Sequence, residues 1–480
     1  MRKAIAAILL TMVSLGSQAE ERSYEKLYRN LPVEMQQPEQ PNIPSKKLYL
    51  SDFIKGSGAL SGKSREEMQS SDCSDAIAKA ISMLEKMGGG SLVIGAGTWV
   101  TGPIELKSRI DLHLEAGATL LFTNDKSAYF PKDAEGRPIV KGRALPCIRA
   151  EKCEDISITG DGVLDGNGQW WRYAKRDKYE SEEWNRLLEM GGSVSEDGKL
   201  WFPYNLKGLP NLTGSPQEEE AIRNHMIILK RCKRIRIEGV TVRNSPKFHI
   251  NPAQCEDVIL ENLKVTCPWN AQNGDGIDIG NCRRVLVSGC LVDCGDDGIC
   301  MKGGSGEKGL KAGPCQDILI CGNTVLHAHG GFVIGSDFSG GMENIVVRDC
   351  IFDGSDIGLR FKSMAGRGGR CKNIYINNIR MRNIVNAAIS FDCGYADVTY
   401  KTLASGDGKG AEFLPEFSDI HISNVRCNGC GTGIFARGMQ GYDCVYDIFI
   451  SDCIIRKAKK KLDVDESTTR LNLSDVRISF

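Results

Sequence analysis

A short pattern of alternating apolar and polar residues recurs along most of the chain. Each unit has two apolar residues separated by one residue, and Gly, Asn or Asp stands two positions after the second of them. The units begin at Ile156, Ile235, Val258, Val285, Ile318, Ile345, Ile374, Ile420 and Ile448. From Ile235 onward, successive units begin 23 to 33 residues apart, with one step of 46. Alternation with period 2 over so few residues predicts short β-strands, and a repeat of this length is typical of one solenoid coil.

Other repeat architectures fit this pattern less well. Leucine-rich and helical repeats need a stretch of period 3.6 in every unit, which this sequence lacks. Propeller blades need about 40 or more residues and four strands each. The pattern therefore predicts an all-β fold, a parallel β-helix, and the usual handedness of parallel crossovers makes it right-handed.

The 19 cysteines follow the same repeat. The position three residues before the start of a unit is a cysteine in six of the nine units: Cys153, Cys232, Cys255, Cys282, Cys315 and Cys371. The other three units have Met342, Phe417 and Val445 at this position. A second slot, five residues after the start, holds Cys290, Cys350 and Cys453. A slot shared with Met, Phe and Val is apolar and buried, and free Cys behaves there as a small hydrophobe. We expect ladders of buried cysteines that are mostly reduced. Stacked neighbours lie within disulfide reach, so isolated disulfide bridges are kept as an alternative.

Three segments fall outside the repeat. Residues 74–84 carry apolar residues at helical spacing, with Ser74 as the expected N-cap and Gly88 to Gly90 as the end. This amphipathic helix is expected to cap the N-terminal end of the solenoid, where strand edges would otherwise be unpaired. Residues 172–221, rich in charge and Trp, form an insertion. We therefore divide the chain into a leader (1–19), an N-terminal extension (20–70) and the β-helix (71–480).

The N-terminus has the features of a secretory signal peptide. A basic start is followed by an apolar run from Ala4 to Leu15 and by the small residues Ser17 and Ala19. The run is too short to span a membrane, and no other apolar stretch approaches the roughly 18 residues that a span requires. With 61 basic and 61 acidic residues, nothing indicates a nucleic-acid partner. We expect an exported protein, periplasmic or secreted, and monomeric.

Two acidic motifs stand out among the turns. They are Asn273-Gly274-Asp275-Gly276 and Gly295-Asp296-Asp297-Gly298. Asp275 and Asp296 are 21 residues apart, close to one coil, so we expect them on the same face with backbones about 4.8 Å apart. Adjacent residues of a strand point to opposite faces. Asp296 and Asp297 can therefore share a cleft only at a bend, which the flanking glycines permit.

Basic groups follow in the next two coils. His329 comes 32 residues after Asp297, and Arg360 and Lys362 come 31 and 33 residues after His329. Carboxylates packed together raise at least one pKa, which yields an acid that stays protonated beside ionised partners. The cations would bind an anionic substrate group. Glycoside hydrolases use a carboxylic acid as the proton donor and a carboxylate beside it as the base or nucleophile.

With these motifs in order, the chain resembles the polygalacturonases and related pectin hydrolases of glycoside hydrolase family 28, which are right-handed parallel β-helices. The resemblance covers nearly the whole mature chain, including Thr98 to Pro103 and Gly160 to Trp171. The stretch from His329 to Gly341 is most similar to the bacterial exo-acting branch.

The resemblance implies a role for each residue of the site. Asp296 matches the general acid, Asp275 and Asp297 match the pair that activates water in an inverting attack, and His329 matches the histidine that supports them. The implied substrate-binding residues are Arg360, Lys362, Asn273, Lys302 and Tyr395. Gly274 and Ala328 stand where the family usually has Thr and Gly, which bears on specificity. No cofactor and no metal is implied.

The function expected from the sequence is hydrolysis of α-1,4-galacturonosyl linkages in pectin. We expect attack at a chain end, because the long aromatic insertion would close one end of an open groove. Three alternatives are kept. They are hydrolysis of rhamnogalacturonan-type linkages, a calcium-dependent pectate lyase on the same fold, and a carbohydrate-binding solenoid without catalysis. The last would not need the carboxylate cluster.

Overall fold

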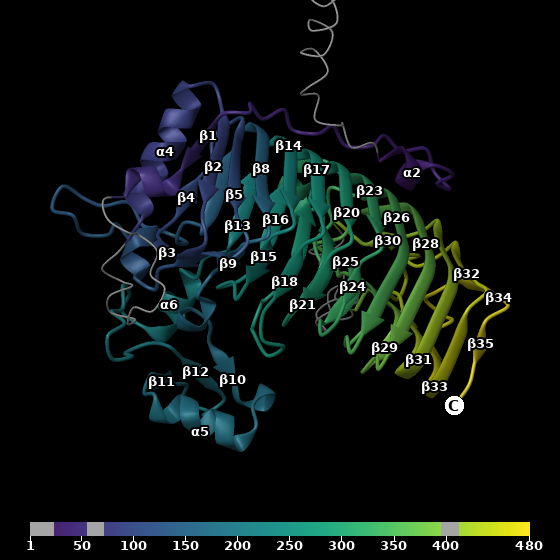
Figure 1. Ribbon diagram of the computed structural model, residues 1–480. Helices are drawn as coiled ribbons and strands as arrows, with labels where there is room; N and C mark the ends of the chain where they lie inside the picture. The colour runs from purple at the N-terminus through teal and green to yellow at the C-terminus, as the bar shows by residue number, and fades with distance from the viewer. Residues whose placement is uncertain (1–23, 55–71, 395–411) are drawn as a thin grey trace, which may run out of the picture.

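The computed structural model describes residues 24–54, 72–394 and 412–480 (Figure 1). The expected signal peptide and Tyr395 both lie outside these ranges. The described strands run parallel from coil to coil and form the expected right-handed parallel β-helix, except for a small antiparallel sheet in the insertion. Among the described residues, no helix is long and apolar enough to cross a membrane.

Each coil contributes strands to three faces of the solenoid. The first, here called the repeat face, carries the apolar pattern. Its strands are β1 (Lys47–Tyr49), β2 (Gly90–Ile94), β5 (Ile110–Leu114), β8 (Glu154–Gly160), β14 (Lys233–Glu238), β17 (Glu256–Glu261), β20 (Arg283–Ser288), β23 (Cys315–Cys321), β26 (Met342–Asp353), β28 (Arg370–Arg382), β31 (Ile420–Arg437), β32 (Ile448–Ser451) and β34 (Leu471–Ser474).

The chain then turns to a second face. Its strands include β3 (Gly97–Thr101), β6 (Ala118–Phe122), β9 (Val163–Asp165), β15 (Thr241–Arg243), β18 (Lys264–Thr266), β21 (Leu291–Asp293), β24 (Thr324–Val325), β33 (Ile454–Val464) and β35 (Arg477–Ile478). The third, here called the site face, has β4 (Ile104–Glu105), β7 (Ile148–Glu151), β13 (Ile227–Lys230), β16 (Ile250–Ala253), β19 (Ile277–Gly280), β22 (Asp297–Lys302), β25 (Gly330–Gly335), β27 (Leu359–Lys362) and β29 (Ala387–Asp392).

The apolar repeat aligns residue by residue on the repeat face. Ile156 pairs with Ile235, and the pairing continues through every predicted unit to Ile448. All of these side chains are fully buried. The nine predicted coils are therefore confirmed. The sequence analysis missed coils at both ends: at β5 Leu114 stands in place of the turn residue, whereas at β34 the pattern of Leu471, Leu473 and Asp475 is present and was overlooked.

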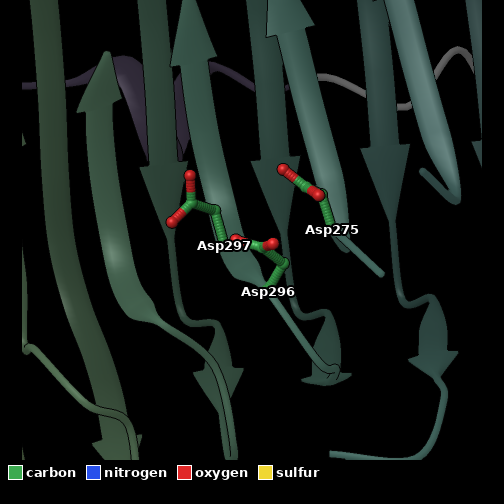
Figure 2. Close-up of side chains that lie close together, drawn as sticks. All are labelled: Asp275, Asp296 and Asp297. Atoms are coloured by element: carbon green, nitrogen blue, oxygen red, sulfur yellow. The ribbon is translucent and has the colours of Figure 1, made fainter. Parts of the chain in front are cut away.

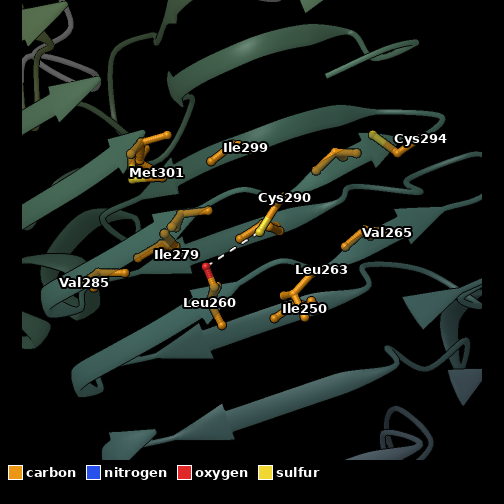
Figure 3. Packing of buried hydrophobic residues seen from close by; sticks show 14 of the residues in the cluster. Ile250, Leu260, Leu263, Val265, Ile279, Val285, Cys290, Cys294, Ile299 and Met301 are labelled. Carbon is orange, nitrogen blue, oxygen red and sulfur yellow. Dashed lines mark hydrogen bonds between the residues drawn. The ribbon is translucent and has the colours of Figure 1, made fainter. Parts of the chain in front are cut away.

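The cysteines stack inside the solenoid as expected. The slot before the repeat aligns Cys315 with Met342, Cys371, Phe417 and Val445, so the four side-chain types occupy equivalent positions. All 19 cysteines are free thiols, and 18 of them are buried. Figure 3 shows Cys290 among aliphatic side chains, with its thiol donating to the Leu260 carbonyl oxygen at 3.6 Å. Burial raises the pKa of the Cys290 thiol to about 12, so this group is unreactive.

Helix α4 (Ser74–Lys86) covers the N-terminal end of the solenoid (Figure 1). Its apolar residues Ile77, Ile81 and Leu84 are buried against the core. The expected N-cap is wrong. The helix begins at Ser74, whose backbone N–H donates to the Asp72 carboxylate at 2.8 Å. The Ser74 hydroxyl instead accepts a hydrogen bond from the Gly102 N–H, which ties the helix to the first coils.

The insertion forms a small unit beside the solenoid (Figure 1). It contains a three-stranded antiparallel sheet, helix α5 (Ser181–Glu189) and helix α6 (Pro216–Ala221). The sheet consists of β10 (Ala174–Lys175), β11 (Ser193–Val194) and β12 (Leu200–Phe202). Trp184 and Trp201 anchor its own apolar cluster. A folded unit of this kind can hold side chains against the groove.

Part of the N-terminal extension runs along the outside of the repeat face. Helix α2 (Glu25–Tyr28) and the residues that follow pack on the outward side chains of Ile259, Leu286, Leu319 and Val346. The extension thus covers an apolar row on the outside of the repeat face, a different face from the one that carries the polar site.

Candidate active site

The two acidic motifs meet at the edge of the site face. Ile277 pairs with Ile299, and Asp275 and Asp297 each stand two residues earlier in adjacent coils. Asp296 lies beside them at the same bend (Figure 2). One carboxylate oxygen from each of Asp275, Asp296 and Asp297 lies within 4.8 Å of the other two. The structure thus brings together the three carboxylates that the sequence singled out.

The glycines of these motifs allow the coils to approach. A Cβ on Gly276 would lie 2.7 Å from the Gly298 carbonyl oxygen, and one on Gly295 would lie 2.3 Å from the Ala271 oxygen. Neither position therefore has room for a side chain. A Cβ on Gly274 would lie 2.8 Å from the Cys267 sulfur. The departure from Thr at this position is thus matched by a cysteine that occupies the space.

Three basic side chains surround Asp297. The Lys362 ammonium donates to its two carboxylate oxygens at 2.8 and 3.1 Å. The Arg360 guanidinium lies 3.5 Å from one of these oxygens, and the Lys302 ammonium lies 3.6 Å from the other. Burial alone would raise the pKa of Asp297, but Lys362, Lys302 and Arg360 hold it well below its usual range. Asp297 is therefore an ionised, buried carboxylate at neutral pH.

Asp275 has the opposite electrostatic environment. It is 3% exposed, and burial followed by the charges of Asp278 and Asp296 raises its pKa well above the usual range. Lys302, at 3.7 Å, opposes this rise without cancelling it. A raised pKa within the cluster was expected, and it belongs to Asp275, where burial contributes more to the rise than the neighbouring carboxylates do.

Asp278 is a fourth carboxylate that the sequence analysis missed. It is fully buried on β19 and lies 3.4 Å from the Lys302 ammonium. Burial raises its pKa to about 6, while Lys302 lowers it. The signal in the sequence was weak, because Asp278 between Ile277 and Ile279 looks like an ordinary outward polar residue of a strand. Lys302 thus contacts Asp275, Asp278 and Asp297 at once.

Asp296 is the most accessible of the three carboxylates, with 20% of its side chain exposed. Its Oδ1 lies 3.0 Å from His329 Nδ1. The other ring nitrogen of His329 lies 3.2 Å from the Lys178 ammonium, which comes from the insertion. The insertion therefore reaches the carboxylate cluster, a contact that no sequence pattern indicated.

The remaining expected residues take distinct positions. The Asn273 side-chain oxygen accepts a hydrogen bond from Arg223 at 2.9 Å, and Arg223 also donates to the Gln272 carbonyl oxygen. Arg223 is fully buried and forms an ion pair with Glu220 at 2.6 Å, so it holds this turn rigidly. Ala328 is buried just before His329.

The spacing of the three carboxylates would also suit a metal ion. Lys302 and Lys362 already supply positive charge to the same oxygens. A divalent cation placed there would be repelled by these ammonium groups, so the arrangement favours acid–base chemistry on an anionic substrate.

A family model described as glycosyl hydrolases family 28 matches residues 190–408. The exopolygalacturonase of Thermotoga maritima has a similar solved structure, with a TM-score of 0.72 and 29% identity over 92% of this chain and 94% of that one. This chain is thus similar to glycosyl hydrolases family 28. The family 28 exopolygalacturonase of Yersinia enterocolitica, 22% identical with a TM-score of 0.61 over 91% of this chain and 78% of that one, shares the fold.

Two curated relatives match this chain over part of their length. It is 29% identical over 369 residues to an exo-poly-alpha-D-galacturonosidase of Dickeya chrysanthemi, which covers 74% of this chain and 60% of the relative. It is 28% identical over 316 residues to a probable polygalacturonase of Vitis vinifera, which covers 64% of this chain and 56% of the relative. The chain thus spans less than two thirds of the length of these two relatives.

Proposed function

We propose that this protein hydrolyses α-1,4-galacturonosyl linkages of polygalacturonate. The observation that carries the proposal is the cluster of Asp275, Asp296 and Asp297, whose oxygens lie within 4.8 Å, beside three cationic side chains. Carboxylates supply the acid and the base of glycoside hydrolysis, and the cations suit a polymer of sugar acids. The polygalacturonase names of the relatives agree with this substrate.

Asp296 acts as the general acid in this proposal. It is more exposed than its two neighbours, so its carboxyl can reach the oxygen of the leaving sugar. His329 holds one of its oxygens and so fixes the direction of the carboxyl. A proton donor must be aimed in this way before its pKa matters.

Asp275 and Asp297 activate the attacking water. They occupy equivalent positions in adjacent coils, so one water between them can contact both carboxylates. Asp297 is held ionised by its cations and accepts a proton from this water. Direct attack by water inverts the anomeric configuration, so an α-linkage yields a β-anomer. Nuclear magnetic resonance of the first-formed product tests this step, and an α-anomer would instead require a covalent intermediate.

Arg360, Lys362, Lys302, Asn273 and Tyr395 bind the substrate in this proposal. Arg360 and Lys302 line the cluster from two sides of Asp297, where they can attract a galacturonate carboxylate. Asn273 is pre-positioned by Arg223, which lowers the entropy lost on binding. No cofactor takes part.

Attack from a chain end follows from the position of the insertion. Its Lys178 contacts His329 beside the acid, so the insertion bounds the groove next to the carboxylates. A groove closed on one side fits a polymer end better than the middle of a chain. The exo-acting names of the Dickeya and Thermotoga relatives support this part of the proposal.

The protein is proposed to act outside the cytoplasm as a monomer. Residues 1–19 have the composition of a cleaved signal peptide, and export delivers the enzyme to the periplasm or the medium. Pectic polymers are too large to enter cells freely, so export agrees with the substrate.

Assays of the purified protein on polygalacturonate and on rhamnogalacturonan test the proposed activity. We expect new reducing ends from polygalacturonate and no rise in the ultraviolet absorbance of unsaturated products. Chelation should leave the rate unchanged. Release of reducing ends from rhamnogalacturonan alone would replace the substrate, and a calcium-dependent absorbance rise would identify a lyase.

A further inference from the structure

A second cationic group lies one coil before the catalytic carboxylates. Ile250 of β16 pairs with Ile277 of β19, so Phe248 occupies the position that Asp275 occupies in the next coil. Lys247 precedes it and corresponds to Gly274. Adjacent coils are about 4.8 Å apart. Lys247 and Phe248 are therefore the next surface that a polymer meets when it extends from the carboxylates toward the N-terminal end.

The ring of Phe248 links this surface to the catalytic cluster. The Lys247 ammonium and the Lys302 ammonium both lie 5.9 Å from the centre of this ring. Lys302 is the residue that contacts Asp275 and Asp297. The half-buried ring thus offers an apolar surface on which one face of a sugar ring can stack, and Lys247 supplies a positive charge beside it.

A further aromatic ring and a second cation continue the surface by one more coil. The His225 ring centre is 4.6 Å from that of Phe248, and the Arg143 guanidinium contacts His225 Nε2. Burial lowers the pKa of His225 to about 2, so this imidazole is neutral and adds no charge. Arg143 is exposed at the end of the row.

Positive charge is in excess at this surface. Arg223 is balanced by Glu220 at 2.6 Å, but the Lys247 ammonium forms neither an ion pair nor a hydrogen bond with any residue in the described part of the chain. Burial and the charges of Arg143 and Arg223 lower its pKa to about 8, against the opposing charges of Glu220 and Asp275. A ligand carboxylate would supply the missing negative partner.

The insertion bounds this surface. Tyr173 stacks on Phe202 of β12, with ring centres 5.8 Å apart, and the Arg223 guanidinium lies 5.8 Å from the Tyr173 ring centre. Because Arg223 also holds Asn273, this aromatic wall adjoins the catalytic turn. The surface is therefore a bounded part of the groove.

We propose that Lys247 and Arg143 bind the carboxylate of a galacturonate unit that rests on Phe248, on the opposite side of the scissile bond from Arg360. The inference rests on the proposed function and adds a specificity site to it. It makes the enzyme require acid groups on both sides of the bond it cuts. Methyl esterification of the unit on Phe248 would then weaken binding, because the ester carries no charge.

The test compares Lys247→Ala with wild type on trigalacturonate. Loss of a charge-assisted hydrogen bond should raise KM roughly tenfold or more, with kcat within about threefold of wild type. Lys247→Arg should restore most of the affinity. Lys264→Ala, which removes an exposed lysine on β18, is the matched control and should leave KM unchanged. Thermal denaturation identifies any variant that has lost its fold, and Lys247→Gln then replaces the alanine variant.

A double substitution separates this site from the one around Arg360. If the two cations bind different carboxylates, the effects of Lys247→Ala and Arg360→Ala on the free energy of binding should add. An unchanged KM for folded Lys247→Ala and Lys247→Gln, or non-additive effects, would overturn the inference. A wild-type protein that releases no reducing ends from polygalacturonate would instead overturn the proposed function, so the two failures are distinguishable.

Discussion

Lys362 donates hydrogen bonds to both carboxylate oxygens of Asp297, and both side chains are almost completely buried. The pair joins strand β27 to strand β22, two coils earlier. Lys362 was expected from the sequence to bind substrate. Its contact with Asp297 shows that it also sets the charge of a proposed catalytic group.

Replacing Lys362 by Met should therefore affect stability and turnover together. The change removes the nearest of the three cations around a buried carboxylate, and Arg360 and Lys302 remain, so we expect a cost of up to about 3–5 kcal/mol of unfolding free energy. Lys372→Met, which breaks an exposed ion pair with Glu343, is the control and should cost no more than about 1 kcal/mol. Denaturant titration at pH 7 measures both values.

The same variant has a readout in catalysis. Because the cations hold the pKa of Asp297 low, loss of Lys362 should raise that pKa and move the acidic limb of the kcat profile to higher pH. A change in KM alone, with an unmoved acidic limb, would show that Lys362 acts only on the substrate.

Asp278 should make stability depend on pH. Its pKa in the folded protein, about 6, is above its usual value of 3.8, so the folded state binds the proton more tightly. Its contribution is then fully present below pH 3.8 and is lost as the pH rises through 6. Asp278→Asn cannot ionise. Its melting temperature relative to wild type should therefore rise between about pH 4 and pH 7, where the proton of Asp278 is lost.

Melting curves at both pH values check this prediction. Asp349→Asn, at a half-exposed carboxylate on β26, is the control. A difference between Asp278→Asn and wild type that stays the same at both pH values would mean that Asp278 does not titrate in this range.

Asp296→Asn should remove proton donation while leaving binding intact. Turnover on polygalacturonate should fall about 100-fold to 10,000-fold, the usual contribution of a general acid. Affinity for trigalacturonate, measured by calorimetry, should change little because the side chain keeps its shape. Retention of more than about a tenth of wild-type turnover would contradict the acid role.

The cysteine ladders predict the result of a thiol titration. Protein unfolded in denaturant without reductant should show all 19 thiols. The native protein should react far more slowly, and first at Cys267, the one cysteine that is not fully buried. A count of one thiol or none after unfolding would replace the ladders by a disulfide framework.

Much of the fold could be predicted from the sequence because each coil repeats one short strand that carries two buried apolar side chains. The register from Ile156 to Ile448 follows directly from that spacing. The coil at β5 was missed because Leu114 replaces the turn residue there. The N-cap was assigned to Ser74 although Asp72, two residues earlier, accepts the hydrogen bond, because sequence propensity does not fix where a helix begins.

The site was predictable only as far as coil spacing determines it. The meeting of Asp275, Asp296 and Asp297 follows from residues one coil apart. Burial and the distance of each carboxylate from Lys302 determine which of them has a raised pKa, and coil spacing reveals neither. The contact between Lys178 and His329 joins segments with no periodic relation, so it required the folded structure.

The central claim is that this protein removes sugars from the ends of polygalacturonate chains. The most direct measurement is the size distribution of products during the first few per cent of hydrolysis, followed by chromatography together with solution viscosity. We predict mono- or digalacturonate as the sole early product, with viscosity falling slowly as reducing ends appear. An early collapse of viscosity with a broad mixture of oligomers would contradict the account, because it would show an open groove that cuts within the chain.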